Sequence, residues 1–196
     1  YDAMGCYPLF FCDDWSSLKV DIDNNDLDLI SLTVVTDPFG KFDETLLNNC
    51  FNSLVVPFKQ HFVTDLSKDP EEFINKHNRR YAKKALKAVS VEVTNNPIDL
   101  SDVWVEMYRN LISRHSIEGV AAFSEDSLRK HLNVTGAVTI VARHGSQVVG
   151  ITVWYVQNNI AYYHLGAYSD EGYSLRASYA IFPKAIEYFK KIGVAW

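Results

Sequence analysis

Three consecutive stretches near the end of the chain have the composition of β-strands, are joined by tight-turn sequences and lead directly into a helical pattern. The strands are expected at residues 137–143, 147–157 and 160–168. His144-Gly145-Ser146 and Asn158-Asn159 separate them, and Gly and Asn tolerate the positive φ that tight hairpin turns need. A helix is expected from about Arg176 to Lys191. The pattern predicts an antiparallel meander followed at once by a crossover helix, an order that few folds contain.

A helix, a strand and two further helices are expected before the meander. Asp69-Pro70 is typical of a helix start, and lysines up to Lys87 favour its end because cations stabilise the negative end of the helix dipole. Residues 89–94 alternate as a strand, and helices are expected at about 100–113 and from Ser124 to about 132. We therefore expect an α/β (α+β) fold with a central mixed, mainly antiparallel sheet flanked by helices. Residues 194–196 are expected to begin another strand, which leaves this fold incomplete at its C-terminal end.

The first third of the chain has weaker patterns. Residues 29–36 are an apolar, β-branched run typical of a buried strand, Asp43 is expected to cap a helix that ends at Cys50, and residues 58–66 alternate as a second strand. No Pro/Gly/Ser-rich linker interrupts the chain. We expect an N-terminal α/β segment over residues 1–59 and the main core over residues 60–196.

Composition and charge exclude several classes of function. The formal net charge of -5 disfavours wholesale binding to nucleic acid or to an anionic membrane. Cys6, Cys12 and Cys50 form neither a disulfide framework nor a metal-binding spacing, so no metal is expected and a reducing cytoplasm is favoured. No apolar run has the length of a membrane helix, and a signal-peptide pattern is lacking.

The order of elements and the amino-acid sequences of four segments resemble a known superfamily. The segments are FINKHNRRYAKKALK, WVEMYRNLISRHSIEG, VARHGSQVVGITVWYV and AYYHLGAYSDEGYSLRASYAIFPKAIEYF. They are similar to the GNAT (acyl-CoA N-acyltransferase) fold, in its FemAB-related branch, over residues 60–196. Residues 1–59 match less specifically and are interpreted as the remnant of a preceding half-domain. The resemblance implies transfer of an acyl or aminoacyl group to an amine.

The same resemblance implies that the acyl donor lies along the third meander strand, with its phosphates at the start of the next helix. The residues that this implication selects for cofactor binding are Leu165, Gly166, Ala167, Tyr168, Gly172, Arg176, Ala177 and Ser178. A helix start favours an anion because its N–H groups carry partial positive charge. The loop reads SDEGYS and departs from the pattern of acetyl-CoA enzymes at every position except Gly172. Asp170 and Glu171 would repel a pyrophosphate, which keeps an aminoacyl-tRNA donor as an alternative, and plain helix capping also explains them.

Period-two alternation predicts which residues share a face of the meander. A two-residue turn at Asn158-Asn159 pairs Tyr155 with Tyr162, Trp154 with Tyr163 and Val153 with His164. One face is then expected to hold the residues Tyr155, Tyr162, His164, Gly166 and Tyr168.

His164 is the candidate general base, since imidazole titrates near neutrality, with a hydrogen-bonded structural histidine as the alternative. Tyr155 or Tyr179 could protonate a leaving group, although tyrosines on such faces also serve for packing.

Two further sets of residues are candidates for substrate contacts. We expect the acceptor to bind Arg114 and His115, at a helix end, and Tyr162, on the meander. Arg114 and His115 would also suit a helix C-terminus by charge alone. A cationic helix face is expected from the residues Lys76, Arg79, Arg80, Lys83, Lys84 and Lys87. This face could hold tRNA or remain solvated.

The sequence therefore predicts an N-acyltransferase that moves an acyl group from acyl-CoA to a small-molecule or peptide amine by direct attack. No Ser/His/Asp or Cys/His arrangement supports a covalent enzyme intermediate. The alternatives are an aminoacyl-tRNA-dependent peptidyltransferase of the FemAB type and a non-catalytic GNAT-like binding module.

Overall fold

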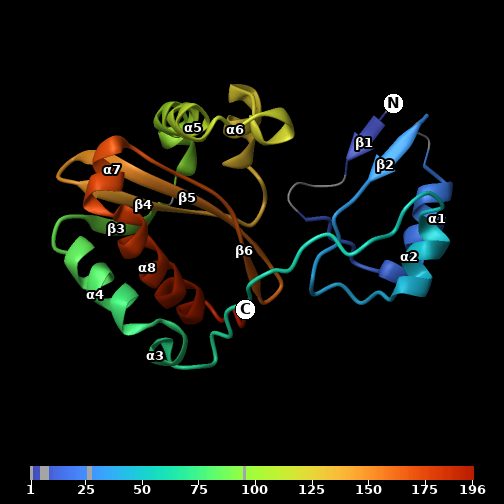
Figure 1. Ribbon diagram of the computed structural model, residues 1–196, viewed down its shortest axis with the longest axis horizontal. Coiled ribbons are helices and arrows are strands. Elements are labelled where there is room, and N and C mark those ends of the chain that lie inside the picture. Colours follow the sequence, from blue (N-terminus) through green and yellow to red (C-terminus); the bar gives the residue numbers. More distant parts are fainter. Residues whose placement is uncertain (1, 5–8, 26–27, 95) are drawn as a thin grey trace. The chain divides into compact units, whose positions relative to one another are not determined.

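The computed structural model describes residues 2–4, 9–25, 28–94 and 96–196 of the chain, which divides into two compact units, residues 1–62 and 63–196 (Figure 1). Cys6 lies outside the described residues, whereas Cys12 and Cys50 are free thiols. None of the helices in the described ranges has the length and apolar character of a membrane span. Within the same ranges, no cluster of three or more His, Cys, Asp or Glu residues is arranged to hold a metal ion.

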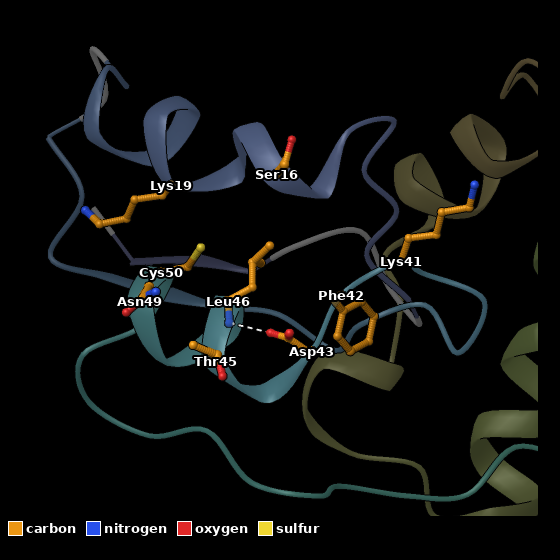
Figure 2. A pocket seen from close by; sticks show the side chains of 9 residues that line it. All are labelled: Ser16, Lys19, Lys41, Phe42, Asp43, Thr45, Leu46, Asn49 and Cys50. Atoms are coloured by element: carbon orange, nitrogen blue, oxygen red, sulfur yellow. Dashed lines mark hydrogen bonds between the residues drawn. The ribbon is translucent and has the colours of Figure 1, made fainter.

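The first unit is a small α/β arrangement with little core. Strands β1 (Asp2–Met4) and β2 (Ser31–Thr33) pair in parallel, and the helical elements are η1 (Trp15–Ser17), α1 (Leu18–Asp23) and α2 (Glu44–Cys50). Asp43 caps α2 as expected, because its carboxylate accepts from Leu46 N at 2.8 Å. A cavity of about 650 Å³ lies between η1–α1 and α2, and Figure 2 shows Leu46 and Cys50 of α2 on its wall. The strand expected at 29–36 is shorter and only partly buried.

The second unit is built on a four-stranded antiparallel sheet in the order β3-β4-β5-β6. The strands are β3 (Ser90–Thr94), β4 (Ala137–His144), β5 (Gln147–Gln157) and β6 (Ile160–Tyr168). The helical elements are α3 (Pro70–Phe73), α4 (Lys76–Ala85), η2 (Pro97–Leu100), α5 (Ser101–His115), η3 (Gly119–Ala121), α6 (Glu125–His131), α7 (Asp170–Leu175) and α8 (Ala177–Lys191). The three predicted meander strands are therefore confirmed.

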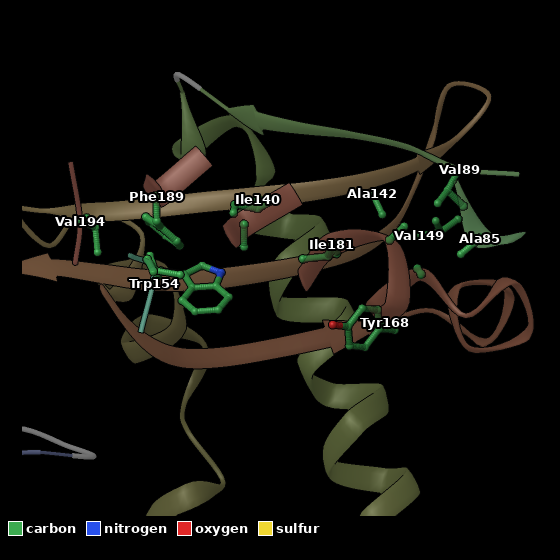
Figure 3. Packing of buried hydrophobic residues seen from close by; sticks show 14 residues of the cluster. Ala85, Val89, Ile140, Ala142, Val149, Trp154, Tyr168, Ile181, Phe189 and Val194 are labelled. Carbon is green, nitrogen blue, oxygen red and sulfur yellow. The ribbon is translucent and has the colours of Figure 1, made fainter. Parts of the chain in front are cut away.

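Helices cover both faces of this sheet (Figure 1). On one face, Ile181 and Phe189 of α8 pack with Ile140, Val149 and Trp154 of the sheet (Figure 3). The other face is covered by α5 and α6, and the apolar cluster there contains the residues Trp104, Tyr108, Leu128, Val141, Ile151, Val153 and Ala167. Because the central strands contact helices on both sides, their sequences are almost continuously apolar.

Three predicted elements differ from the structure for local reasons. The helix expected from Asp69 to Lys87 is two helices, because the side chain of Asn75 accepts from Asn78 N at 2.8 Å and starts α4 afresh after extended Ile74. Residues 58–66 are not a strand, since alternation without a neighbouring strand supplies no ladder of hydrogen bonds.

Residues 194–196 are also not assigned as a strand, although they lie beside the start of β6. Ala161 N donates to Trp196 O at 2.9 Å, and Ala195 N donates to Asn159 O at 2.7 Å. Leu66 N reaches Ala195 O at 2.9 Å from the other side, so this short segment is held between two parts of the unit. Beyond Ala161, β6 is an edge strand of the described sheet.

Candidate active site

A bulge in the pairing of β5 with β6 lies at the candidate base. The pairs nearest the turn form as expected, but Val153 pairs with Leu165 and the register shifts between Val153 and Trp154. The prediction that Val153 faces His164 is therefore wrong. His164 is the extra residue on β6, and such a residue breaks the simple alternation of side chains along a strand.

The bulge separates residues that were expected to share one face. Tyr168 belongs to the cluster under α8, and Gly166 lies below the Tyr163 hydroxyl, whose ring packs at 5.3 Å from that of Phe182 in α8. His164 instead contacts residues of the α5–α6 face. The expected single face is therefore wrong for Gly166 and Tyr168, whereas Tyr155 and His164 do share a face. Leu165 and Ala167 point into the α5–α6 cluster, so only their backbone is positioned to contact a donor molecule.

His164 lies in a buried aromatic environment and is only 7% exposed. Its ring centroid is 4.7 Å from those of Tyr155 and His131, and its Nε2 lies 3.4 Å from Nδ1 of His131. Burial, and secondarily the charge of a protonated His131, lower the pKa of His164 to about 3. The imidazole is therefore neutral at physiological pH.

Tyr155 joins His164, whereas Tyr179 does not. The Tyr155 hydroxyl donates to the backbone oxygen of His131 at 3.3 Å, and burial raises the pKa of Tyr155 to about 12. Tyr162 pairs with Tyr155 across the strands, as expected. Tyr179 lies on α8, where its ring packs at 5.3 Å from that of Tyr81 in α4, on the opposite side of the sheet.

The segment expected to be a phosphate-binding loop is helical. Ser169 caps α7 by accepting from Gly172 N at 3.1 Å, so this amide is already used. A Cβ atom on Gly172 would lie 1.9 Å from Val149 O, which shows that glycine is needed here for close packing of α7 against β5. Asp170 and Glu171 are each paired with a cationic or basic side chain, Arg114 at 2.6 Å and His144 at 2.7 Å respectively.

The start of α8 is the remaining expected anion site. Arg176 adopts the left-handed conformation with φ of 58° between α7 and α8, and its guanidinium lies 4.0 Å from the ring centroid of Tyr81. Ala177 is fully buried, while Ser178 is part-buried and close to the helix start. The residues at this junction therefore combine an exposed cation with the first turn of a long helix.

Arg114 and His115 lie at the exposed end of α5. Beyond its pairing with Asp170, the Arg114 guanidinium stacks 4.2 Å from the ring centroid of Tyr173, so this residue joins α5 to α7. Arg114 is thus positioned beside the end of β6 rather than beside His164.

Sequence reasoning missed His131, the second partner that the fold brings to His164. His131 ends α6, its Nε2 lies 3.4 Å from the Ser127 hydroxyl, and the ring of Phe123 packs edge-on at 4.9 Å. Burial lowers the pKa of His131. The spacing of Ser127 and His131, four residues apart on an expected helix, is a signal that could have drawn attention to this pair.

A second cavity of about 430 Å³ lies on the α5 side of the sheet near Ser169. Its apolar wall comes from Val103, Met107 and Val148, and polar side chains that include Glu106 and Arg143 form its rim. Arg143 is paired with Glu92 at 2.7 Å, so its charge is compensated. This cavity is separate from the histidine pair.

The arrangement of a bulged edge strand that continues into helices agrees with comparisons to known proteins. The family described as acetyltransferase (GNAT) domain matches residues 73–196. The chain belongs to the GNAT family. The expected superfamily and fold class are therefore confirmed. A search of curated proteins found no match.

Solved structures share this GNAT fold. FemX is 12% identical with a TM-score of 0.54, and the match covers 67% of this chain and 50% of FemX. The C-terminal domain (DUF2156) of a candidate lysylphosphatidylglycerol synthetase from Agrobacterium fabrum is 14% identical with a TM-score of 0.53, and the match covers 67% of this chain and 42% of that one. The chain thus spans half or less of these structures. At these identities the likeness shows a shared fold.

Replacement of Gly172 by Ala tests whether this glycine packs α7 or serves a ligand. We expect Gly172→Ala to lower the free energy of unfolding by about 1–3 kcal/mol, because the added methyl group overlaps Val149 O and α7 must move. Urea unfolding measures this loss, with Ser174→Ala on the exposed side of α7 as the control. A variant as stable as the wild type would exclude the packing role.

Acid should weaken the fold through His164. Since its folded-state pKa is depressed, the unfolded chain takes up a proton between pH 6.5 and about 3 that the folded chain does not. This group therefore stabilises the fold above pH 6.5, and its contribution decreases by up to about 1.4 kcal/mol per pH unit as the pH falls. Urea unfolding of the wild type and His164→Gln should show a difference that changes with pH in this direction. Parallel curves would contradict the burial of a neutral imidazole.

Proposed function

We propose that this GNAT domain transfers an acyl group from acyl-CoA to a primary amine by direct attack of the amine. The observation that supports this proposal most is the contact of His164 with His131 and Tyr155 beside the bulge in β6, at the edge of the sheet. Titratable groups and an open strand edge then lie together, as an acyl-transfer site requires.

Three residues at the start of α8 are suited to the phosphates of such a donor. Arg176 supplies an exposed cation, and the first amides of α8 at Ala177 and Ser178 supply the positive end of a helix dipole. Gly172 does not fit this role, because its amide is bonded to Ser169. The acidic pair at the start of α7 is less repulsive than its sequence suggested, since Arg114 neutralises Asp170. Bound acyl-CoA would supply an activated thioester carbonyl.

The protein's contribution is to orient the reactants and to accept a proton. A backbone N–H within residues 165–167 is the proposed donor to the acyl oxygen, where negative charge develops. The neutral histidine pair can accept a proton from the attacking ammonium. The Tyr155 hydroxyl, protonated at neutral pH, donates to His131 O at the end of α6. Arg114, His115 and Tyr162 remain proposed contacts for the acceptor.

Calorimetry with coenzyme A and acetyl-CoA tests the choice of donor. We expect measurable heat and a thermal shift with wild-type protein, and at least about tenfold weaker binding to Arg176→Ala, because a charge-assisted contact to phosphate is worth about 1.5–3 kcal/mol. Lys184→Ala, which removes an exposed cation elsewhere on α8, is the matched control. No heat and no thermal shift at millimolar ligand would exclude acyl-CoA as the donor.

Aminoacyl-tRNA is the second proposed donor, and the charge of α4 favours it. Arg80, Lys83 and Lys84 are exposed on this helix, and Arg79 is part-buried with a partner in Glu71. Such a face can follow a phosphate backbone, and each phosphate contact adds salt dependence to the affinity.

Removal of these cations separates the two donors. The combined variant Arg79→Ala, Arg80→Ala, Lys83→Ala and Lys84→Ala should weaken tRNA binding and flatten its dependence on salt, in a filter-binding series from low to high salt. The control replaces Lys184, Lys190 and Lys191 of α8 by Ala. Equal losses in both variants, or no tRNA binding by the wild type, would exclude this donor.

The first unit, residues 1–62, is proposed to derive from a preceding half-domain. It is compact by itself and lies outside the residues that match the GNAT family. Its cavity between α1 and α2 is therefore not assigned to the acyl-transfer site.

A further inference from the structure

The two histidines on the α5–α6 face differ in access to substrate. Nδ1 of His164 is a buried atom, and the residue as a whole is 7% exposed. His131 is only part-buried, at the end of α6, and its Nε2 faces the hydroxyl of Ser127. An acceptor amine can therefore reach the ring of His131 with less rearrangement than that of His164.

The contacts between the rings have the form of a base with a positioning partner. His164 Nε2 lies 3.4 Å from His131 Nδ1, and the two rings meet edge to face at an interplanar angle of 85°. Tyr155 of β5 contacts the same end of α6 through its hydrogen bond to His131 O. The ring of Phe123 packs edge-on against the His131 ring at 4.9 Å. The ring of His131 is thus held by contacts from β5, β6 and the turn before α6.

We propose that His131 is the catalytic base of this site and that His164 is its positioning residue. In the resting state, His131 Nδ1–H donates to His164 Nε2, which leaves the Nε2 lone pair of His131 available beside Ser127. This inference rests on the proposed acyl transfer, and it assigns the proton to a residue that the sequence did not single out.

Each atom is accounted for in the step. A proton leaves the acceptor ammonium for His131 Nε2, the nitrogen lone pair then forms a bond to the acyl carbon, and the carbon–sulfur bond of the thioester breaks. The coenzyme A thiolate leaves with that electron pair. The second proton of the amine nitrogen goes to the thiolate or to water, and the imidazolium returns its proton to solvent past Ser127.

Electrostatics favour this division of roles. Protonation of His164 would place a charge in a buried site, and a pKa of about 3 makes it a weak base at neutral pH. His131 keeps more contact with solvent, and neutral His164 offers a lone pair to its Nδ1–H. The other groups around it add little charge: Tyr155 is neutral, and Arg129 and Lys130 of α6 are paired with Asp102 and Asp126.

Matched substitutions separate a base from a structural residue. Asn at position 131 retains a polar atom near the Nδ1 position, and Gln at position 131 retains one near the Nε2 position, but neither takes up a proton. With acetyl-CoA and hexylamine as probes and release of thiol as the readout, His131→Asn and His131→Gln should each lower kcat by about 10²-fold or more. Wild-type kcat in either folded variant would overturn the proposal.

Position 164 should behave differently. His164→Gln keeps an acceptor for the His131 Nδ1–H and should lower kcat by less than either substitution of His131, whereas His164→Leu removes the acceptor and destabilises the imidazolium of His131. The pH of half-maximal rate should therefore move lower in His164→Leu alone. A loss of about 10²-fold in His164→Gln, with His131→Asn unaffected, would assign the base to His164 and overturn the proposal.

An NMR measurement tests the assignment of the base even if the probes are not substrates. With ¹⁵N-labelled histidine in the full 196-residue chain, His131 should titrate, and His164 should remain neutral with its proton on Nδ1. An Nε2–H tautomer of His164 would overturn the assignment whether or not transfer is seen. Absence of both donor binding and thiol release, with the expected tautomer present, would count against the proposed function alone.

Discussion

Burial of both faces of the two central strands is the constraint on which the second unit depends. Ile140 of β4 and Val149 of β5 face α8, whereas Val141 and Ile151 face α5 and α6, and all four are fully buried. Each such side chain contributes roughly 1.5–3 kcal/mol relative to an exposed position. Helices must therefore cover the sheet on both sides, and the titratable His164 lies on the edge strand β6.

His164 brings a polar side chain into this apolar arrangement at a bulge. Counted from the turn, unbroken alternation would keep residues 164, 166 and 168 on the face of Tyr155 and Tyr162. With the extra residue, His164 stays on that face beside a second histidine and a tyrosine, whereas Tyr168 lies on the face of α8. Desolvation of two imidazoles costs stability, and the cost is limited because both remain neutral at physiological pH and because His131 keeps access to solvent.

Local signals predicted those parts of the fold in which short-range chemistry and burial act together. Turn residues at Gly145 and Asn158, both with positive φ, delimit the three strands, and Asp43 and Ser124 cap helices as expected. Prediction failed where two local preferences compete. The apolar and cationic residues around Ile74 are spaced as in one continuous helix, yet Asn75 caps a new helix. Ser169 starts a helix by the same capping chemistry, in a segment that glycine and acidic residues made look like a loop.

The chain's own residues determined the order of elements, the family to which it belongs and the presence of a histidine on the third meander strand. Those properties follow from periodicity, caps and turns, which act over a few neighbouring residues. Only the tertiary structure brought His131 within 3.4 Å of His164, since these residues are far apart in sequence and meet because α6 packs on a bulged strand. A one-residue shift of register reverses a side chain's direction, and pairing between strands, rather than the local sequence, determines where that shift occurs.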